Sequence, residues 1–187
     1  MNYLILVNKN NGLGKGYIPD NLVKVKIKTG GNKKIYLEKK TYKQIKKILK
    51  DINKFFDTEI VIDSGYRPYL YQENLLKDLI KKKGNEAYKS LARPGYSEHQ
   101  TGLAVDIGFY KNGVYIPSFN IEDYKSEFKW LNDNAYKYGF IIRYPKGKEE
   151  VTGYIYEPWH LRYVGKTAEF LTKHDLTLEE YYNMFIS

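Results

Sequence analysis

Short strand-like segments and amphipathic helical segments interleave along this chain without a regular strand–helix–strand spacing. Apolar residues at intervals of three and four predict helices, and short runs of β-branched and aromatic residues predict strands. The expected strands are residues 3–7, 23–28, 59–65, 103–109, 140–144 and 159–164. The expected helices are residues 41–55, 69–84, 85–92, 126–139, 167–175 and 177–185. Several strands follow one another closely, which favours an α+β fold with a central, mostly antiparallel sheet flanked by helices.

The length and the charge of the chain restrict its domain organisation and its partners. With 187 residues, no internal repeat and no linker-like segment, the sequence predicts a single domain over residues 1–187. The net charge of +9 favours anionic partners in general. The lysine-dense stretches at 33–50 and 79–84 are nevertheless interpreted as solvated helix faces rather than as a nucleic-acid patch. No nucleic-acid partner is therefore predicted, and the oligomeric state stays open.

Two absences restrict the chemistry and the compartment. The chain has no cysteine, which excludes disulfides, zinc–thiolate sites and a cysteine nucleophile. The apolar run near the start, residues 3–7, has no preceding basic region and no small-residue cleavage site, and no run elsewhere could span a membrane. A cytoplasmic protein without a membrane segment is expected if Met1 is the native start. A membrane-anchored or exported protein is the alternative if it is not.

Two distant segments carry residues that could form one metal site. "GYSEHQTGLAVDIG" holds His99 and Asp106, and "YEPWHLRYVG" holds His160. Two imidazoles and one carboxylate suit a catalytic zinc ion, which keeps three protein ligands and one open position. Glu157 stands three residues before His160, where a carboxylate could take a proton from zinc-bound water. Taken singly, His99 is more often a polar surface or cap residue, and Glu-x-x-His is common by chance, so the hypothesis depends on the combination.

The residues around these positions resemble a known family. "SEHQTGLAVDIG" matches the Ser-x-His-x-x-Gly-x-Ala-x-Asp signature of the zinc D-alanyl-D-alanine carboxypeptidases and dipeptidases of the VanY and VanXY type. "YEPWHLRYVG" matches their Glu-x-x-His signature, and "DSGYRPYLYQ" matches their Ser-Gly-Tyr-Arg segment. The stretch at 138–160 is especially similar to the VanXY subgroup. Three motifs in the family's order resemble it over nearly the whole chain, which implies the hedgehog-like zinc D,D-peptidase fold.

The resemblance implies a metal site and a general base. Its zinc ligands fall on His99, Asp106 and His160, which would hold one Zn²⁺ per chain. Its general base falls on Glu157. A carboxylate in that place activates the attacking water and then protonates the leaving amine.

The resemblance also implies residues that contact the substrate. Its arginine falls on Arg67, which would steady the substrate carbonyl as that carbonyl becomes an oxyanion. Gln72 and Ser97 fall on positions that bind the C-terminal end of the substrate, although a solvated helix residue and a turn residue are the alternatives. Tyr154 is a further residue that could reach the substrate.

The function implied by the resemblance is zinc-dependent hydrolysis of the terminal D-Ala-D-Ala bond. The substrate would be a small peptide, either the free dipeptide or a peptidoglycan precursor, and the reaction would serve glycopeptide resistance or the editing of wall precursors. Relatives on the same scaffold leave two alternatives open, an L,D-carboxypeptidase and an L-alanyl-D-glutamate endopeptidase. A non-catalytic protein with a structural zinc is disfavoured, since such a site needs neither Glu157 nor Arg67.

Overall fold

The computed structural model describes residues 2–119 and 122–186, and its main feature is a five-stranded antiparallel sheet. The strand order is β3-β4-β7-β6, and β5 pairs with the C-terminal half of β4. The strands are β3 (Glu59–Ser64), β4 (Ala104–Lys111), β5 (Val114–Ile116), β6 (Phe140–Tyr144) and β7 (Glu157–Tyr163). A separate antiparallel pair consists of β1 (Leu22–Lys24) and β2 (Tyr36–Glu38). The expected α+β fold with a mostly antiparallel sheet is confirmed.

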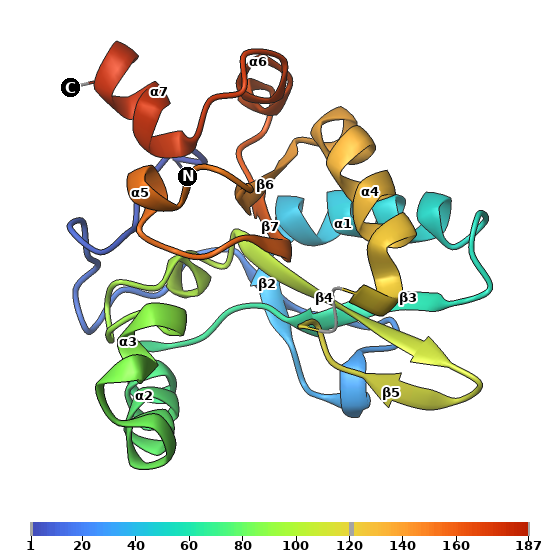
Figure 1. Cartoon of the computed structure of the whole chain (residues 1–187), viewed down its shortest axis with the longest axis horizontal. Helices are drawn as coiled ribbons and strands as arrows, with labels where there is room; N and C mark the ends of the chain where they lie inside the picture. Colours follow the sequence, from blue (N-terminus) through green and yellow to red (C-terminus); the bar gives the residue numbers. More distant parts are fainter. Residues whose placement is uncertain (1, 120–121, 187) are drawn as a thin grey trace.

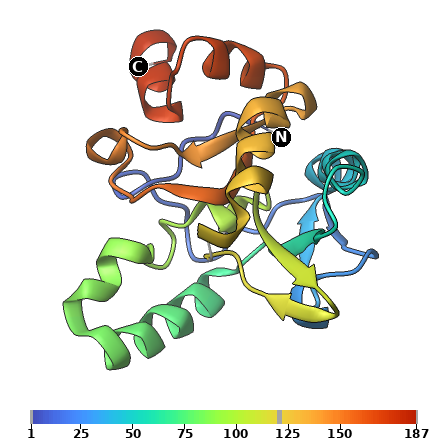
Figure 2. The same ribbon diagram turned by 45° about the vertical axis from the view of Figure 1, so that its right-hand side comes forward.

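The helices cover the sheet unequally (Figure 1). They are α1 (Lys39–Ile52), α2 (Tyr69–Lys83), α3 (Ala87–Ser90), α4 (Lys125–Asn134), α5 (Glu149–Thr152), α6 (Thr167–Lys173) and α7 (Leu178–Phe185). Helices α1 and α4 pack on the main sheet and on each other, and α6 lies beside β6. Helices α2 and α3 project from the opposite side of the molecule (Figure 2). One face of the sheet is therefore sealed by helices, and the other is left for polar side chains.

The alternation of side chains along the strands decides which residues enter the core. Val105 and Leu161 are register partners on β4 and β7, and both are fully buried in the main apolar cluster. The next pair, Asp106 and His160, must point to the opposite face because successive side chains of a strand alternate. The pairing of two central strands thus places two polar groups side by side.

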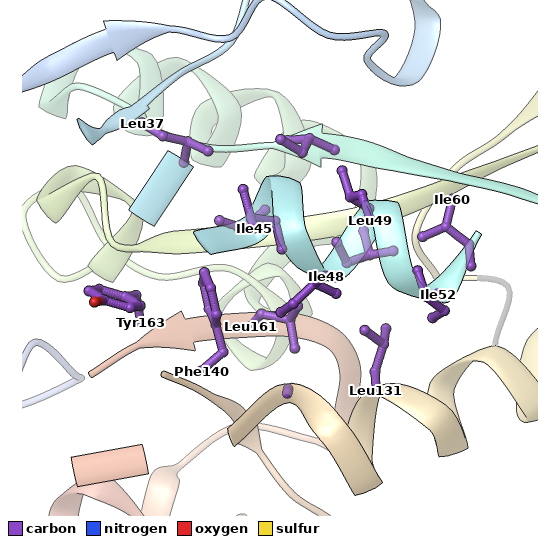
Figure 3. Packing of buried hydrophobic residues seen from close by; sticks show 14 of the residues in the cluster. Leu37, Ile45, Ile48, Leu49, Ile52, Ile60, Leu131, Phe140, Leu161 and Tyr163 are labelled. Carbon is purple, nitrogen blue, oxygen red and sulfur yellow. The ribbon is translucent and has the colours of Figure 1, made fainter. Parts of the chain in front are cut away.

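Helix α1 provides much of the main core. Ile45, Ile48 and Ile52 recur at helical spacing, are fully buried and face the sheet strands and α4 (Figure 3). Burial of each such side chain stabilises the fold by roughly 1.5–3 kcal/mol. The helix begins where the Glu38 carboxylate accepts a hydrogen bond from the backbone N–H of Thr41. The lysines between the apolar positions remain outside.

The structure corrects the N-terminal strand predictions. Residues 3–7 form no strand, because their carbonyls bond to a side chain instead: Arg162 Nη2 donates to the carbonyl oxygens of Tyr3 and Ile5 at 3.1 and 2.7 Å. The strand expected at 23–28 is limited to β1, which ends at Lys24. The sequence patterns also missed β2, β5 and α5, each of only three or four residues. Such short segments carry too little periodicity to be detected.

The helix ends agree better with the sequence. Gly84 follows α2 with a positive φ of 57°, and Thr177 and Glu180 form the expected capping box before α7. The helix expected at 126–139 is α4, which continues as a short 3₁₀ turn at Ala135–Tyr138. Within the described residues, no helix is both long and apolar enough to cross a bilayer. The cytoplasmic location expected above stays a prediction.

Candidate metal centre and active site

Three predicted ligands converge on the polar face of the sheet. Asp106 and His160 are register partners on β4 and β7, and His99 lies on the 3₁₀ turn Glu98–Thr101 just before β4. His99 Nε2 lies 3.3 Å from Asp106 Oδ2, and His160 Nδ1 lies 3.1 Å from Asp106 Oδ1. One donor atom from each residue fits within a cluster no more than 4.8 Å across. The structure thus brings together two segments that are about 60 residues apart in the sequence.

The hydrogen bonds around the two imidazoles decide which nitrogen atoms face the centre. His99 Nδ1 lies 2.7 Å from the carbonyl oxygen of Gly65 and can donate to it, which leaves the Nε2 lone pair directed at Asp106. A side chain at Gly65 would not fit, since its Cβ would meet the carbonyl oxygen of Tyr36 at 2.6 Å. His160 presents Nδ1 to the same carboxylate. The fixed orientation of both rings is typical of metal-binding histidines.

The donor atoms fit a zinc ion. His99 Nε2 and Asp106 Oδ1 are buried and have no hydrogen-bond partner in the described structure. Buried polar atoms without a partner are costly, and a cation between them would remove that cost. Two imidazole nitrogens and one carboxylate oxygen are a ligand set that zinc uses in catalytic sites, with a fourth position left for water.

Glu157 lies beside the three donors because of an irregularity in the sheet. The register between β6 and β7 shifts between Ile142 and Tyr144, and Tyr144 pairs with Glu157. Strict alternation would place Glu157 and His160 on opposite faces, since they are three residues apart. The irregularity turns Glu157 to the polar face, where its Oε2 lies 3.7 Å from His160 Nδ1.

The surroundings of Glu157 suit proton transfer. Its side chain is mostly buried, and burial, reinforced by the neighbouring Asp106 and Glu98 carboxylates, raises its pKa to about 7 despite the opposing effects of His160 and Arg67. A carboxyl group with a pKa near the working pH can both accept and return a proton. The geometry and the proton affinity therefore meet the requirements of the general-base role predicted for Glu157, which stays a prediction.

Arg67 lies at the junction of two cavities. It follows β3, and its backbone N–H donates to the carbonyl oxygen of His99 at 3.2 Å, which ties the two motifs together. Its Nε is buried without a hydrogen-bond partner in the described structure. The side chain lines both cavities, so an unused donor faces the site.

The smaller cavity, of ≈ 40 Å³, is lined by the catalytic candidates. Ser97 and Tyr154 are both buried and line it together with Glu157, His99 and His160. The Tyr154 hydroxyl has no hydrogen-bond partner in the described structure, and burial, followed by the nearby Glu157 and Glu98 carboxylates, raises its pKa to about 12. It therefore remains a neutral hydroxyl that can donate.

Gln72 does not line either cavity. It is fully buried on α2, and its Nε2 donates to the carbonyl oxygen of Ala92 at 2.7 Å. Ala92 and its neighbour Leu91 line the small cavity, so Gln72 holds part of the cavity wall. Its Oε1 is buried without a hydrogen-bond partner in the described structure. Direct contact between Gln72 and a substrate stays a prediction.

The larger cavity, of ≈ 700 Å³, adjoins the same centre on the side of α2 and β3. It shares Arg67 with the small cavity, and Asp106 contributes to its lining. Its remaining wall is rich in aromatic side chains, namely Tyr36, Tyr66, Tyr71, Phe119 and Trp159. The metal-site residues therefore lie between a small cavity and a larger one with many aromatic side chains.

Sequence reasoning missed a buried ionic network behind His160. Glu98 accepts hydrogen bonds from Arg143 Nε at 2.9 Å and from Arg162 Nη1 at 3.0 Å, and its Oε1 lies 3.7 Å from His160 Nε2. Glu179 on α7 pairs with the outer edge of the Arg143 guanidinium. Arginines within the apolar runs "FIIRY" and "WHLRYV" were the available signal, since a charge in a buried strand requires a partner.

The comparisons with known proteins agree with this site. Residues 34–166 match the family model described as VanY, D-alanyl-D-alanine carboxypeptidase. The chain is 36% identical over 188 residues to VanXYC of Enterococcus gallinarum, a bifunctional D-Ala-D-Ala dipeptidase and carboxypeptidase. That alignment covers 98% of this chain and 95% of VanXYC.

Two solved structures resemble this one closely. The LdcB LD-carboxypeptidase has a TM-score of 0.86 and 43% sequence identity, over 97% of this chain and 86% of that one. The vancomycin-resistance D,D-pentapeptidase VanY, solved as a mutant in complex with Zn(II), has a TM-score of 0.80 and 30% identity, over 98% of this chain and 100% of that one. Together with the family match, these similarities show that the chain belongs to the D-alanyl-D-alanine carboxypeptidase family of peptidases.

Proposed function

We propose that this protein is a zinc-dependent carboxypeptidase that removes a C-terminal D-alanine from peptides of the peptidoglycan type. The observation that carries the proposal is the convergence of His99, Asp106 and His160 beside Glu157, at the junction of a small cavity and a larger groove. Zinc is the metal in the VanY structure that this chain resembles, and the donor set present here suits it.

Different side chains of the site have different roles in the proposed reaction. His99, Asp106 and His160 would hold the zinc ion, which supplies a Lewis acid and lowers the pKa of a bound water to roughly 7. Glu157 takes the proton from the attacking water and later gives it to the leaving amine, so one carboxylate serves as base and acid. Arg67, whose Nε has no partner in the described structure, donates to the oxygen of the scissile carbonyl as its negative charge develops.

The sizes of the two cavities support an orientation of the substrate, with one end in each cavity. The terminal D-alanine is small and would occupy the ≈ 40 Å³ cavity beside Ser97 and Tyr154, whose hydroxyls can donate to its carboxylate. The acyl part of the peptide would extend along the ≈ 700 Å³ groove, where aromatic side chains offer apolar contact. A free dipeptide would leave most of this groove empty, so we expect weaker catalysis on the dipeptide than on a longer peptide.

A second candidate activity keeps the site and changes the bond. The 43% identity with the LdcB LD-carboxypeptidase favours cleavage of an L,D bond before the terminal D-alanine of a tetrapeptide. The small cavity would hold the same leaving D-alanine in both reactions. The D,D and L,D activities therefore differ in how the residue before the scissile bond fits against Arg67 and the groove.

The test is product analysis with three substrates side by side. The purified chain loaded with zinc is incubated with D-Ala-D-Ala, with a pentapeptide ending in D-Ala-D-Ala, and with the corresponding tetrapeptide, and the products are identified by mass spectrometry. Release of D-alanine from the pentapeptide, with a lower kcat/KM on the dipeptide, supports the D,D proposal. Cleavage of the tetrapeptide alone assigns the L,D activity, and cleavage between L-alanine and D-glutamate contradicts both.

A further inference from the structure

Nine lysines line two adjoining grooves that are formed by α1, β1 and the residues just after β1. One groove, of ≈ 560 Å³, lies between α1 and the start of β3, and the other, of ≈ 750 Å³, lies between α1 and β1. Lys43 and Lys46 line both grooves, so the two form one continuous surface. We call this surface the lysine face. Its nine exposed lysines are Lys24, Lys26, Lys28, Lys39, Lys40, Lys43, Lys46, Lys47 and Lys50.

The lysine face carries nearly all of the excess charge of the chain. The chain has 31 basic and 22 acidic residues. The two grooves include only two acidic residues, Glu38 and Glu59; without these and the nine lysines, 22 basic and 20 acidic residues remain. Glu38 is buried and caps α1, and Glu59 pairs with Lys28, so neither neutralises the other eight lysines. The excess of positive charge is therefore concentrated on the lysine face and is not spread over the whole surface.

The fold of α1 places these charges in a row. Its isoleucines occupy the side turned to the core (Figure 3). Its lysines are exposed to solvent. Lys39, Lys43, Lys46 and Lys50 are spaced by three and four residues, so neighbouring side chains stand roughly 5–6 Å apart. Positive charges carried on neighbouring side chains repel one another, and an anion bound between them relieves the repulsion. The row is arranged for a ligand that carries several negative charges in a line.

The lysine face lies apart from the catalytic cavities. The two sets of lining residues have no member in common within the described structure. Helix α1 forms one edge of the molecule, while α2 and α3, next to the small cavity, project at another (Figure 2). A molecule bound along α1 would leave the active site open.

Three features select the kind of anion. Stable anchoring to a membrane needs an apolar or lipid anchor besides a basic patch, whereas these lysines line grooves whose one exposed large apolar side chain, among the described residues, is Ile27 at 37%. Single-stranded nucleic acid needs aromatic platforms, but Tyr42 is buried and Tyr3 is partly buried against the core. Lysine ammonium groups bind phosphate as point charges. A base-free chain of phosphodiesters satisfies all three conditions.

We propose that the lysine face docks a linear polyol-phosphate polymer. The choice of this polymer over other base-free polyanions rests on the proposed function, because a peptidase of peptidoglycan peptides would benefit from being held on an anionic polymer that shares the wall with its substrate. Polymers of this kind lie outside the membrane. The proposal therefore also predicts an extracytoplasmic location, against the cytoplasmic location expected from the sequence.

The test compares two variants with equal loss of charge. In the first, Lys43, Lys46, Lys47 and Lys50 on α1 are changed to glutamine; in the second, Lys77, Lys81, Lys82 and Lys83 on α2 are changed in the same way. All eight are exposed, and glutamine has a helix propensity close to that of lysine, so both variants should fold. Binding of purified, fluorescently labelled poly(glycerol phosphate) is titrated at several salt concentrations. Single-stranded DNA of matched charge and phosphatidylglycerol vesicles are the other probes.

We expect the parent protein to bind poly(glycerol phosphate) with an affinity that falls as salt rises. The α1 variant should lose at least on the order of tenfold in affinity with a weaker salt dependence, and the α2 variant should change by less than about threefold. No binding, an equal loss in both variants, or tighter binding of DNA or vesicles than of the polymer would overturn the proposal. Peptide hydrolysis, measured on all three proteins, should be unchanged, so a failure of docking and a failure of the proposed function are distinguishable.

Discussion

Glu157 and Glu98 are two buried carboxylates on opposite sides of the His160 ring, and their surroundings give them opposite proton affinities. Burial raises the pKa of Glu157 to about 7, and the opposing effects of His160 and Arg67 do not cancel it. Burial alone would also raise the pKa of Glu98, but Arg143 and Arg162 hold it well below its ordinary value. Glu98 thus stays charged and Glu157 is able to exchange a proton. The two residues are suited to different tasks at the same site.

The role of Glu157 predicts the effect of its amide variant. Glu157→Gln keeps the size of the side chain and removes its ability to take a proton. Hydrolysis of the preferred peptide should fall by at least about 100-fold, the lower range for loss of a general base. Zinc content, measured on the same samples, should be unchanged because Glu157 is outside the donor set. Turnover near the parental level in a zinc-loaded variant would assign the base to another group.

The position of Glu98 predicts a separate effect on metal affinity. Glu98 Oε1 lies 3.7 Å from His160 Nε2, beyond hydrogen-bond distance, while His160 Nδ1 faces the metal centre, so we expect the negative charge of Glu98 to strengthen the ring as a metal ligand. Glu98→Gln should weaken zinc binding about 10–100-fold, as measured by competition with a chromophoric chelator.

The matched control for Glu98 is Glu179→Gln. This change disturbs the same Arg143 guanidinium without removing a neighbour of His160. It should lower the free energy of unfolding and leave zinc affinity within about threefold of the parental value, since second-sphere effects act through the ligand they touch. Equal zinc affinities in the parent and Glu98→Gln would restrict Glu98 to a structural role.

At the scale of elements, Asp63 connects three segments around the edge strand β3. Its carboxylate accepts hydrogen bonds from Lys33 Nζ at 2.5 Å, from Ser118 Oγ at 2.6 Å and from the Tyr115 hydroxyl. These partners come from the loop before β2, from β5 and from the residues after β5. Burial alone would raise the pKa of Asp63, but the three donors lower it below its ordinary value of 3.8. The charged form of Asp63 therefore stabilises the folded state.

The pH dependence of stability follows from this shift. Because the pKa of Asp63 is lower in the folded state, its contribution is present above about pH 4 and is lost as the pH falls through the folded value. Asp63→Asn should lower the free energy of unfolding by about 1–3 kcal/mol at pH 7, and the difference from the parent should shrink below pH 4. Urea unfolding at pH 7, 5, 4 and 3 checks this. Glu59→Gln, which breaks the exposed pair with Lys28, should have little effect at any pH, and a comparable loss there would contradict the account.

The order of most helices and strands was predictable from the sequence. The predictions that failed did so for physical reasons. Long amphipathic segments such as α1 repeat their signal often enough to be recognised. The segment at 3–7 has the composition of a strand, yet its partner is the side chain of Arg162, which no local pattern reveals. The turn of Glu157 onto the polar face depends on a register shift between two strands, which is a property of the pairing rather than of either strand.

In the whole molecule, helix α1 covers one face of the sheet with its apolar side. Its outer side forms a surface that differs in character from the active-site face. The polar face of the sheet presents a compact site with few exposed charges, while the outer side of α1 presents the lysine face. The sequence predicted the zinc ligands as a set, and the structure brings His99, Asp106 and His160 together. The lysine-dense stretch at 33–50 predicted a solvated helix face, because the sequence does not show that lysines of β1 and α1 meet along shared grooves.

The size of the groove yields a prediction for the whole enzyme. A substrate that fills the ≈ 700 Å³ groove gains contacts that a dipeptide cannot make. Tyr71 is half exposed on α2 and lines this groove but not the small cavity, so Tyr71→Ala should reduce kcat/KM for the pentapeptide and leave that for D-Ala-D-Ala nearly unchanged. Loss of one aromatic contact corresponds to about 1 kcal/mol, or roughly fivefold. An equal effect on both substrates would place the acyl chain elsewhere.

The most direct test of the central claim is a zinc titration of the metal-free chain during catalysis. D-alanine released from a pentapeptide ending in D-Ala-D-Ala is measured as zinc is added in substoichiometric steps, with bound zinc quantified in parallel. The rate should rise in proportion to zinc up to one ion per chain and then stay constant. The same titration of His160→Ala should give no rise over that range. Release of D-alanine at the full rate by the chelator-treated chain, or no release when one zinc is bound, would contradict the central claim.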